Sequence, residues 1–248
     1  MNLYRVLPPP SEMIPLESLE DRAAVLEKLT PPRLPWVRAI MVTNSAGEYQ
    51  GATGTSAGLT RGADRVMLGL YRASADLVLT GASTTRAEPV PIPRSTPLCV
   101  VSASGDLSGH QITTRNNHSL FVVTTAAGGA RVKATAIGLD PVVLTVNSTA
   151  NFGAQEIIEC LAPHVATDHL LVEGGRALWE TFAPITDELV VAVAPPPLST
   201  HQGIPPWWPG DRSGWTLTSL LTDDEKMLYF RYETGLNGVA SANPPQPA

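Results

Sequence analysis

Two apolar segments, far apart in the chain, constrain its fold more than any other feature. One reads LVLTGASTTRAEP (Leu77–Pro89) and the other reads HLLVEGGRALWE (His169–Glu180). Each begins as an apolar run, passes through small, flexible residues and continues as the start of a helix, which is typical of a buried parallel strand that leads into a helix. A helix start favours an anion through its free N–H groups and its dipole. Two such starts in one domain suit a ligand with several phosphates, such as a dinucleotide.

Short apolar runs alternate with segments of helical spacing along most of the chain. The order strand, helix, strand over Trp36–Thr43, Arg61–Ala73 and Asp76–Thr80 is typical of a parallel sheet. Trp215–Leu221 and Lys226–Tyr232 predict a closing antiparallel hairpin. The other expected strands are Leu98–Val101, Leu120–Thr125, Val142–Val146, Leu170–Glu173 and Glu188–Ala194, and the other expected helices are Leu16–Leu29, Phe152–Leu161 and Arg176–Phe182.

Four segments are expected to lie outside this alternation. Met1–Pro15 is broken by prolines, and we expect it to wrap the surface as extended chain. Asn44–Thr60 has no periodicity and is predicted to be a long functional loop. Pro195–Pro209 is a proline-rich loop whose two tryptophans favour packing or a dimer contact, and Gly235–Ala248 is expected to be disordered. We therefore divide the chain into an N-terminal extension with a short helix (1–34), one domain (35–234) and a tail (235–248).

Composition excludes several classes of protein. The chain has 248 residues, of which 43% are apolar and 16% charged, as expected for a globular domain. The formal net charge of −6 argues against nucleic acid as a partner. Neither a membrane span nor a signal pattern is present, so we expect a cytoplasmic protein with no membrane partner. Cys99 and Cys160 are expected to be reduced thiols, and no metal site is expected.

At three positions the chain resembles a known family. Gly81-Ala82-Ser83-Thr84-Thr85-Arg86-Ala87-Glu88 is similar to that family's turn after a strand, Glu173-Gly174-Gly175 to its second strand end, and Asp187-Glu188-Leu189 to a later strand. The family is the reductase domain of the riboflavin-biosynthesis deaminase/reductases. The resemblance implies a single α/β domain of the dihydrofolate reductase type, with a mostly parallel sheet, flanking helices and an antiparallel C-terminal hairpin. It also implies a homodimer.

The resemblance implies an NADPH-dependent reductase. In that family, hydride passes from the cofactor to the ribosyl group of a phosphorylated ribosylaminopyrimidine and reduces it to ribityl. The substrate residues that it implies are Asn44, Ser56, Arg72, Arg94 and Glu173. The cofactor residues that it implies are Thr43, Gly81, Ala82, Thr84, Thr85, Arg86, Glu88, Ser102, Gly174, Gly175, Arg176, Ala177 and Leu178. By the same resemblance we predict a cis peptide bond between Gly174 and Gly175.

Each of these assignments has a plainer alternative. The first turn is also consistent with a helix start capped by Ser83 or Thr84, and the two glycines with a tight turn that binds nothing. Glu173 is also consistent with a carboxylate favoured by a helix dipole, and Arg72 with a solvated helix arginine.

The chain departs from the family after the first strand. Ala46 stands where the family has an aspartate, and Glu48 is the nearest acidic residue. The zinc-deaminase half of the bifunctional enzymes has no counterpart, because the His-x-Glu and Pro-Cys-x-x-Cys motifs are missing. Two other functions therefore stay open: a reductase of another heterocycle, dihydrofolate included, and a protein that binds a dinucleotide without catalysis.

One motif indicates a different chemistry. Residues 54–58 read Gly-Thr-Ser-Ala-Gly, which fits the G-x-S-x-G nucleophile elbow of hydrolases with Ser56 as the nucleophile. The polar, glycine-bearing segment before it is not the buried strand that an elbow requires. We therefore do not expect a serine hydrolase.

Overall fold

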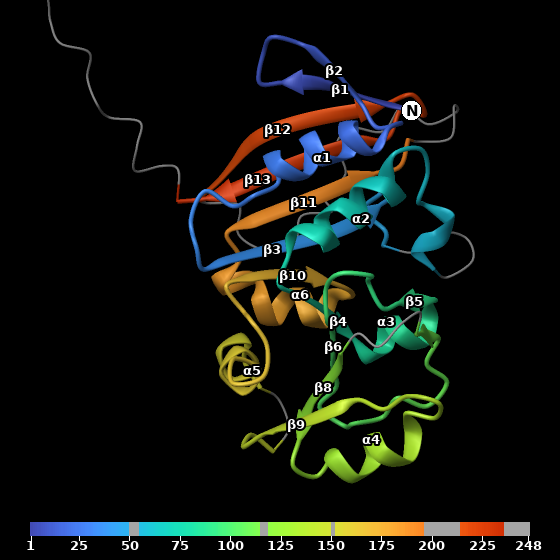
Figure 1. The fold of residues 1–248 in the computed structure, drawn as a ribbon, viewed down its shortest axis with the longest axis vertical. Helices are drawn as coiled ribbons and strands as arrows, with labels where there is room; N and C mark the ends of the chain where they lie inside the picture. The colour runs from blue at the N-terminus through green and yellow to red at the C-terminus, as the bar shows by residue number, and fades with distance from the viewer. Residues whose placement is uncertain (50–54, 115–118, 150–151, 196–213, 236–248) are drawn as a thin grey trace, which may run out of the picture.

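The chain folds around one twisted, mixed sheet of eleven strands (Figure 1). The structure is a computed structural model that describes residues 1–49, 55–114, 119–149, 152–195 and 214–235. The strands lie in the order β2-β1-β12-β13-β11-β3-β10-β4-β6-β8-β9, and β5 (Val90–Pro91) and β7 (Ile112–Thr113) form a separate two-stranded sheet. The expected loop Pro195–Pro209 lies almost wholly outside the described residues, as does the expected tail after Gly235.

The part of the sheet from β11 to β9 is entirely parallel, as the sequence predicts. Its strands are nearly continuous apolar runs because helices cover both faces. The strands are β3 (Trp36–Thr43), β4 (Leu77–Gly81), β6 (Leu98–Val101), β8 (Leu120–Thr125), β9 (Val142–Val146), β10 (His169–Glu173) and β11 (Glu188–Val193). Each agrees with its expected range to within a residue or so.

The helices divide between the two faces. One buried cluster joins α1, α2 and α4 to one face of the sheet, and a second joins α5 and α6 to the other face. The helices are α1 (Leu19–Lys28), α2 (Asp64–Ser74), α3 (Ala82–Ala87), α4 (Gly129–Thr135), α5 (Ala154–Leu161) and α6 (Arg176–Phe182), with single 3-10 turns η1 (Ser56–Gly58) and η2 (Ala183–Ile185). The sequence analysis did not predict α4, since that helix has no side-chain cap and buries only Val132.

The antiparallel end of the sheet differs from the expectation for the N-terminus. The predicted hairpin forms as β12 (Trp215–Asp223) and β13 (Leu228–Thr234). Met1–Pro15, however, does not wrap the surface: it forms β1 (Asn2–Leu7) and β2 (Glu12–Pro15), and β1 pairs with β12. Figure 1 shows these two N-terminal strands beside the C-terminal hairpin. Burial of Leu3, which is 1% exposed, explains why the segment joins the sheet.

A buried ionic cluster lies where the parallel and antiparallel parts meet. Arg38 on β3 and Glu188 on β11 are both fully buried, and their ion pair measures 2.8 Å. Trp36 Nε1 donates to the same Glu188 carboxylate at 3.0 Å, and Arg38 Nη2 donates to the Leu29 carbonyl at 2.8 Å. These bonds satisfy charges that would otherwise be costly to bury. The cluster therefore connects β3, β11 and the end of α1.

Two negative expectations concern thiols and membranes. Both cysteines are free thiols, with Cys99 buried in β6, as the sequence predicts. Burial raises the pKa of the Cys99 thiol well above its ordinary value, so it is not a nucleophile near neutral pH. No helix within the described ranges has both the length and the apolar character needed to cross a membrane.

Candidate functional site

The two strand ends singled out by the sequence lie side by side. β4 and β10 are parallel neighbours, with Leu77 opposite Leu170 and Leu79 opposite Val172. Both strands therefore deliver their carboxyl ends to the same edge of the sheet, where ligands of open α/β sheets bind. The Gly175 amide donates to Thr84 Oγ1 at 3.3 Å, which joins the start of α6 directly to the first turn of α3.

Both helices begin without a side-chain cap. Gly81 is the N-cap of α3 and Gly175 is the N-cap of α6, and neither helix start receives a capping hydrogen bond from a side chain. Thr84 instead accepts the Gly175 amide. The alternative in which Ser83 or Thr84 caps the first turn is therefore not what the structure contains. The first N–H groups of both helices keep their donor capacity.

The turn at Gly174 corrects one prediction. The cis peptide bonds of the described chain all precede prolines, so the Gly174-Gly175 bond is trans and the predicted cis bond is wrong. The turn forms instead through Gly174, whose φ is +143°. A Cβ at Gly174 would lie 3.3 Å from the Gly81 nitrogen and 3.5 Å from Thr84 Oγ1. Glycine is thus required for two reasons, the left-handed backbone and the close approach of the two turns.

Arg72 and Glu173 form a bidentate ion pair beside this edge. Arg72 Nε lies 2.7 Å from Glu173 Oε1, and Nη2 lies 2.6 Å from Oε2. The two side chains are only 17% and 12% exposed. Burial opposes the charge on Arg72, but the charge and hydrogen bonds of Glu173 outweigh it, and the pKa of Arg72 lies above its ordinary value. Arg72 is therefore not a solvated helix arginine, and Glu173 is held by a side chain as well as by its strand.

Ser56 and Glu88 connect the long loop to the end of α3. The Ser56 amide donates to Glu88 Oε1 at 2.5 Å, and its hydroxyl donates to Oε2 at 2.7 Å. Ser56 opens the 3-10 turn η1, and its hydroxyl bonds a carboxylate rather than a histidine. This arrangement gives no support to a hydrolase nucleophile, although Gly54 of that motif lies outside the described residues.

Two further predicted residues lie at the end of β3 and in the loop that follows it. Thr43 is fully buried, and its hydroxyl has no hydrogen-bond partner within the described part of the chain. Asn44 closes its own turn: its Oδ1 accepts the amides of Ala46 and Glu48, both at 2.9 Å, and its Nδ2 donates to Glu48 Oε2 at 2.6 Å. Glu48 thus brings a carboxylate to the turn that contains Ala46, at which the resemblance led us to expect an aspartate.

Among the remaining predicted residues, Ala82, Thr85 and Arg86 lie in α3, and Arg176, Ala177 and Leu178 lie in α6. Ser102 is buried directly after β6, the strand next to β4. Arg86 donates to the Asp106 carbonyl at 2.8 Å, and Arg131 forms a 2.7 Å ion pair with the Asp106 carboxylate. Arg94 is exposed and has no hydrogen bond or ion pair with another described residue.

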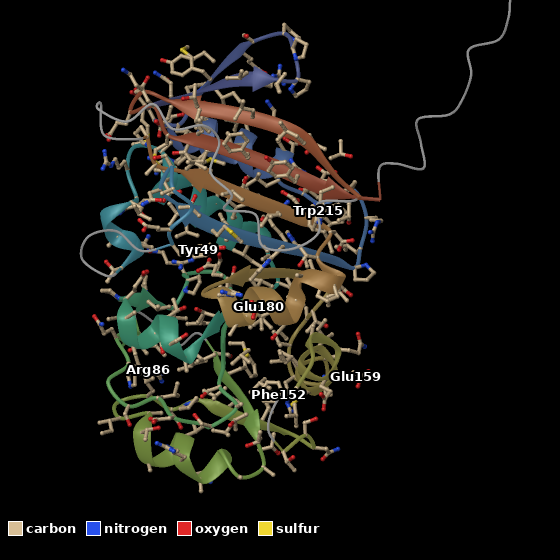
Figure 2. All side chains as sticks on the ribbon, turned by 180° about the vertical axis from the view of Figure 1, so that it is seen from behind. Tyr49, Arg86, Phe152, Glu159, Glu180 and Trp215 are labelled. Carbon is tan, nitrogen blue, oxygen red and sulfur yellow. The ribbon has the colours of Figure 1, made fainter. Side chains whose placement is uncertain are left out.

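The face covered by α6 holds a residue that the sequence analysis missed. Tyr49 packs partly against the second buried cluster, and Figure 2 shows it on the same side of the sheet as Glu180 and Trp215. Burial raises the pKa of the Tyr49 hydroxyl, an effect that nearby Arg176 opposes and Glu180 reinforces. Arg176 itself pairs with Glu180 at 2.6 Å. A tyrosine in a loop without periodicity gives no sequence signal for this placement.

Comparison with known proteins assigns the chain to a family. Residues 35–228 match the family model described as the RibD C-terminal domain, and the chain belongs to this family. This match confirms the resemblance of the sequence to the reductase domain of the riboflavin-biosynthesis deaminase/reductases. No curated protein sequence is significantly similar to the chain.

Solved structures share the fold at low sequence identity. One similar structure is a Thermotoga maritima diaminohydroxyphosphoribosylaminopyrimidine deaminase/5-amino-6-(5-phosphoribosylamino)uracil reductase. It is 15% identical to this chain, with a TM-score of 0.60. The match covers 82% of this chain and 57% of that protein's length. A Corynebacterium diphtheriae pyrimidine reductase-like protein is 17% identical with a TM-score of 0.57, and the match covers 81% of this chain and 92% of that protein. The Saccharomyces cerevisiae riboflavin biosynthesis reductase Rib7 is 13% identical with a TM-score of 0.52, and the match covers 88% of this chain and 100% of that protein. The expected α/β fold of the dihydrofolate reductase type is thereby confirmed.

Proposed function

We propose that the chain is an NADPH-dependent pyrimidine reductase that converts a phosphorylated ribosylaminopyrimidine to its ribityl form in riboflavin biosynthesis. The observation that carries the proposal is the contact between Gly175 and Thr84, which joins two uncapped helix starts at the carboxyl edge of β4 and β10. One extended nucleotide can contact both starts at once. Family membership and the names of the structural neighbours support the choice of a pyrimidine reductase.

The residues of the site fit a dinucleotide in two respects. A Cβ placed on Gly81 or on Gly175 would meet only the hydroxyls of Ser83 and Thr84 within 4 Å, at 3.7 Å or more, so a ligand can approach the backbone of both turns. The Thr43 hydroxyl is buried and has no hydrogen-bond partner among the described residues, which is uncommon unless a ligand or water completes the bond. In the proposed arrangement, the Gly81–Thr85 and Gly174–Leu178 segments hold the diphosphate, and Thr43 faces the nicotinamide end.

Each side chain then has a defined role. Bound NADPH supplies the hydride, and the protein supplies position and electrostatics. Glu173 orients the pyrimidine through hydrogen bonds, and Arg72 fixes the position of the Glu173 carboxylate while its remaining N–H donors face the substrate phosphate. Asn44 and Ser56 border the substrate from the loop side. Basic groups available for the 2′-phosphate of NADPH are Arg86 and Arg131, which meet at Asp106, and Lys133.

The test is a fluorescence titration with NADPH and NADH on the wild type and on Gly175→Val. A Cβ at Gly175 meets no atom closer than 3.9 Å, and its backbone, with φ −68° and ψ 175°, accepts valine, so the variant is expected to fold. Gly153→Val is the matched control. Gly153 is also an N-cap glycine, with φ −81° and ψ 169°, at a helix that follows β9, three strands away from β4.

We expect Gly175→Val to lower the affinity for NADPH at least tenfold and Gly153→Val to leave that affinity unchanged. Equal affinity for NADPH in all three proteins would show that the diphosphate lies elsewhere. Turnover of 5-amino-6-(5-phosphoribosylamino)uracil with NADPH then tests the substrate. Binding without turnover would favour the alternative function of a non-catalytic dinucleotide-binding protein. The presence of Ala46, where an aspartate was expected from the resemblance, is the reason to consider that alternative. Turnover of dihydrofolate instead would favour a reductase of another heterocycle.

A further inference from the structure

A cavity of about 300 Å³ lies under α1, between that helix and the antiparallel strands of the sheet. None of its lining residues belongs to the candidate functional site. Its walls come from β1, β2, α1, α2, β11, β12 and β13. A volume of this size is at the lower end of the range of small-molecule sites, roughly 300–1,000 Å³.

The N-terminal extension closes this cavity. Leu3, Arg5, Ile14, Val25 and Lys28 all line it, and all precede residue 35, where the match to the family model begins. The cavity is therefore built in part by the segment that precedes the residues matched by the family model. Pairing of β1 with β12 and packing of α1 on α2 hold that segment in place.

One end of the cavity is apolar. Leu3, Met67 and Tyr71 are between 1% and 5% exposed and line it together with Leu221. Tyr229 contributes its ring, while its hydroxyl donates to Asp223 at 2.8 Å and is thus already bonded. This end suits a hydrocarbon or aromatic body.

The other end presents donors for an anion. Arg231 Nε lies 2.9 Å from Glu188 Oε1 and Nη2 lies 3.0 Å from Glu233 Oε1, so these ion pairs leave Nη1 of a five-donor guanidinium. The geometry at Nε does not make a hydrogen bond, and this buried atom has no other partner within the described residues. Ser219, which faces Arg231 across the β12–β13 pair, likewise has no hydrogen-bond partner for its hydroxyl in the described chain.

The ionic groups around the polar end leave one positive charge. The cations are Arg5, Lys28, Arg38 and Arg231, and the carboxylates that pair with them are Glu12, Glu188 and Glu233. We propose that this cavity binds a small organic monoanion, a carboxylate with an apolar body. The carboxylate lies against Arg231 and Ser219, with Arg5 and Lys28 at the rim. The site is separate from the reductase site and does not depend on the function proposed above.

Isothermal titration calorimetry with octanoate tests this directly. Octanoate is expected to bind the full-length chain saturably at one site, and octanol, which lacks the charge, at least about tenfold more weakly. Titration with 3-phenylpropionate decides between an aliphatic and an aromatic body, and saturable binding of either acid supports the proposal. The midpoint of thermal unfolding is expected to rise with the concentration of the acid that binds.

Variants locate the site. Ser219→Phe fills the cavity from the sheet and Val25→Phe fills it from α1. Each variant is expected to lower the affinity for the acid at least tenfold. Arg5→Gln is expected to lower the affinity for the acid about threefold to tenfold. Thr222→Phe is the matched control, because Thr222 follows the lining residue Leu221 on the same strand and therefore points to the opposite face.

Three results of the acid titrations would overturn the proposal: no saturable binding of either acid, binding that both cavity-filling variants leave unchanged, or equal binding of octanol and octanoate. An NADPH titration on the same samples separates this proposal from the proposed function. Loss of octanoate with intact NADPH binding in Ser219→Phe supports two sites, whereas NADPH competing with octanoate would contradict them.

Discussion

At the scale of single residues, the site depends on a few atoms whose role sequence reasoning captured only in part. Glycine at positions 174 and 175 was predicted from the need for close backbone approach, and the structure shows that Gly174 alone has the left-handed backbone. The trans bond at this turn could not be inferred, because the same sequence is compatible with either isomer. The Arg72–Glu173 pair could not be inferred either, since it joins residues 101 positions apart.

Gly174→Ala is expected to destabilise the protein. A Cβ there meets the Gly81 nitrogen at 3.3 Å on a backbone that disfavours side chains, and the cost is about 1–2 kcal/mol in the free energy of unfolding. Gly175→Ala, without either restriction, is expected to change it by less than about 0.5 kcal/mol. Urea unfolding of both variants checks the difference, and equal stabilities would contradict the assigned turn.

Glu173→Gln is expected to remove the carboxylate that pairs with a largely buried arginine. The variant should lose about 1–3 kcal/mol of stability, because Arg72 keeps its charge without a matching carboxylate. Arg72→Gln and the double variant complete a double-mutant cycle. The account expects a coupling energy of about 1 kcal/mol or more, and additive single changes would show that the pair contributes nothing measurable.

At the scale of elements, most of the alternation was predictable and the exceptions have physical causes. Apolar runs such as Trp36–Thr43 match their strands residue for residue because burial on both faces leaves a strong signal. β1 and β2 were missed because the prolines at positions 8–10 obscure the alternation, while pairing with β12, over 200 residues away, decides the outcome. α4 was missed because a glycine-rich start and one buried residue give no periodicity.

A buried carboxylate at the start of α2 should give the fold a pH dependence. Burial raises the pKa of Asp64 from 3.8 to about 6, with a smaller contribution from nearby Asp223, while a hydrogen bond from Thr60 opposes the shift. Between these two values the folded chain keeps a proton that the unfolded chain has lost. The contribution of Asp64 to stability therefore falls as the pH rises from about 4 to 6, and the penalty is complete above that range.

Asp64→Asn is accordingly expected to raise the free energy of unfolding by about 1–3 kcal/mol at pH 7.5 and to change it little at pH 4. Denaturant unfolding of wild type and variant across this range measures the effect. Asp140→Asn, at an exposed aspartate, is the control. A variant that is no more stable than the wild type at pH 7.5 would contradict the burial of an ionised Asp64.

At the scale of the whole molecule, the parallel and antiparallel parts of the sheet are joined through the buried Glu188, which pairs with Arg38 on β3 and with Arg231 on β13. Glu188→Gln would leave Arg38 charged, buried and without its partner, and is expected to cost about 3–5 kcal/mol in the free energy of unfolding. Glu233→Gln, at a partly exposed member of the same network, is expected to cost less than about 1 kcal/mol. Equal effects of the two changes in urea unfolding would contradict the central place of Glu188.

The account depends most on the claim that one dinucleotide lies across the ends of β4 and β10. A crystal structure of the chain grown with NADPH measures this directly. The account predicts the diphosphate within hydrogen-bond distance of amides in both Gly81–Thr85 and Gly174–Leu178. A dinucleotide bound at any other edge of the sheet, or one that contacts only one of the two turns, would contradict it.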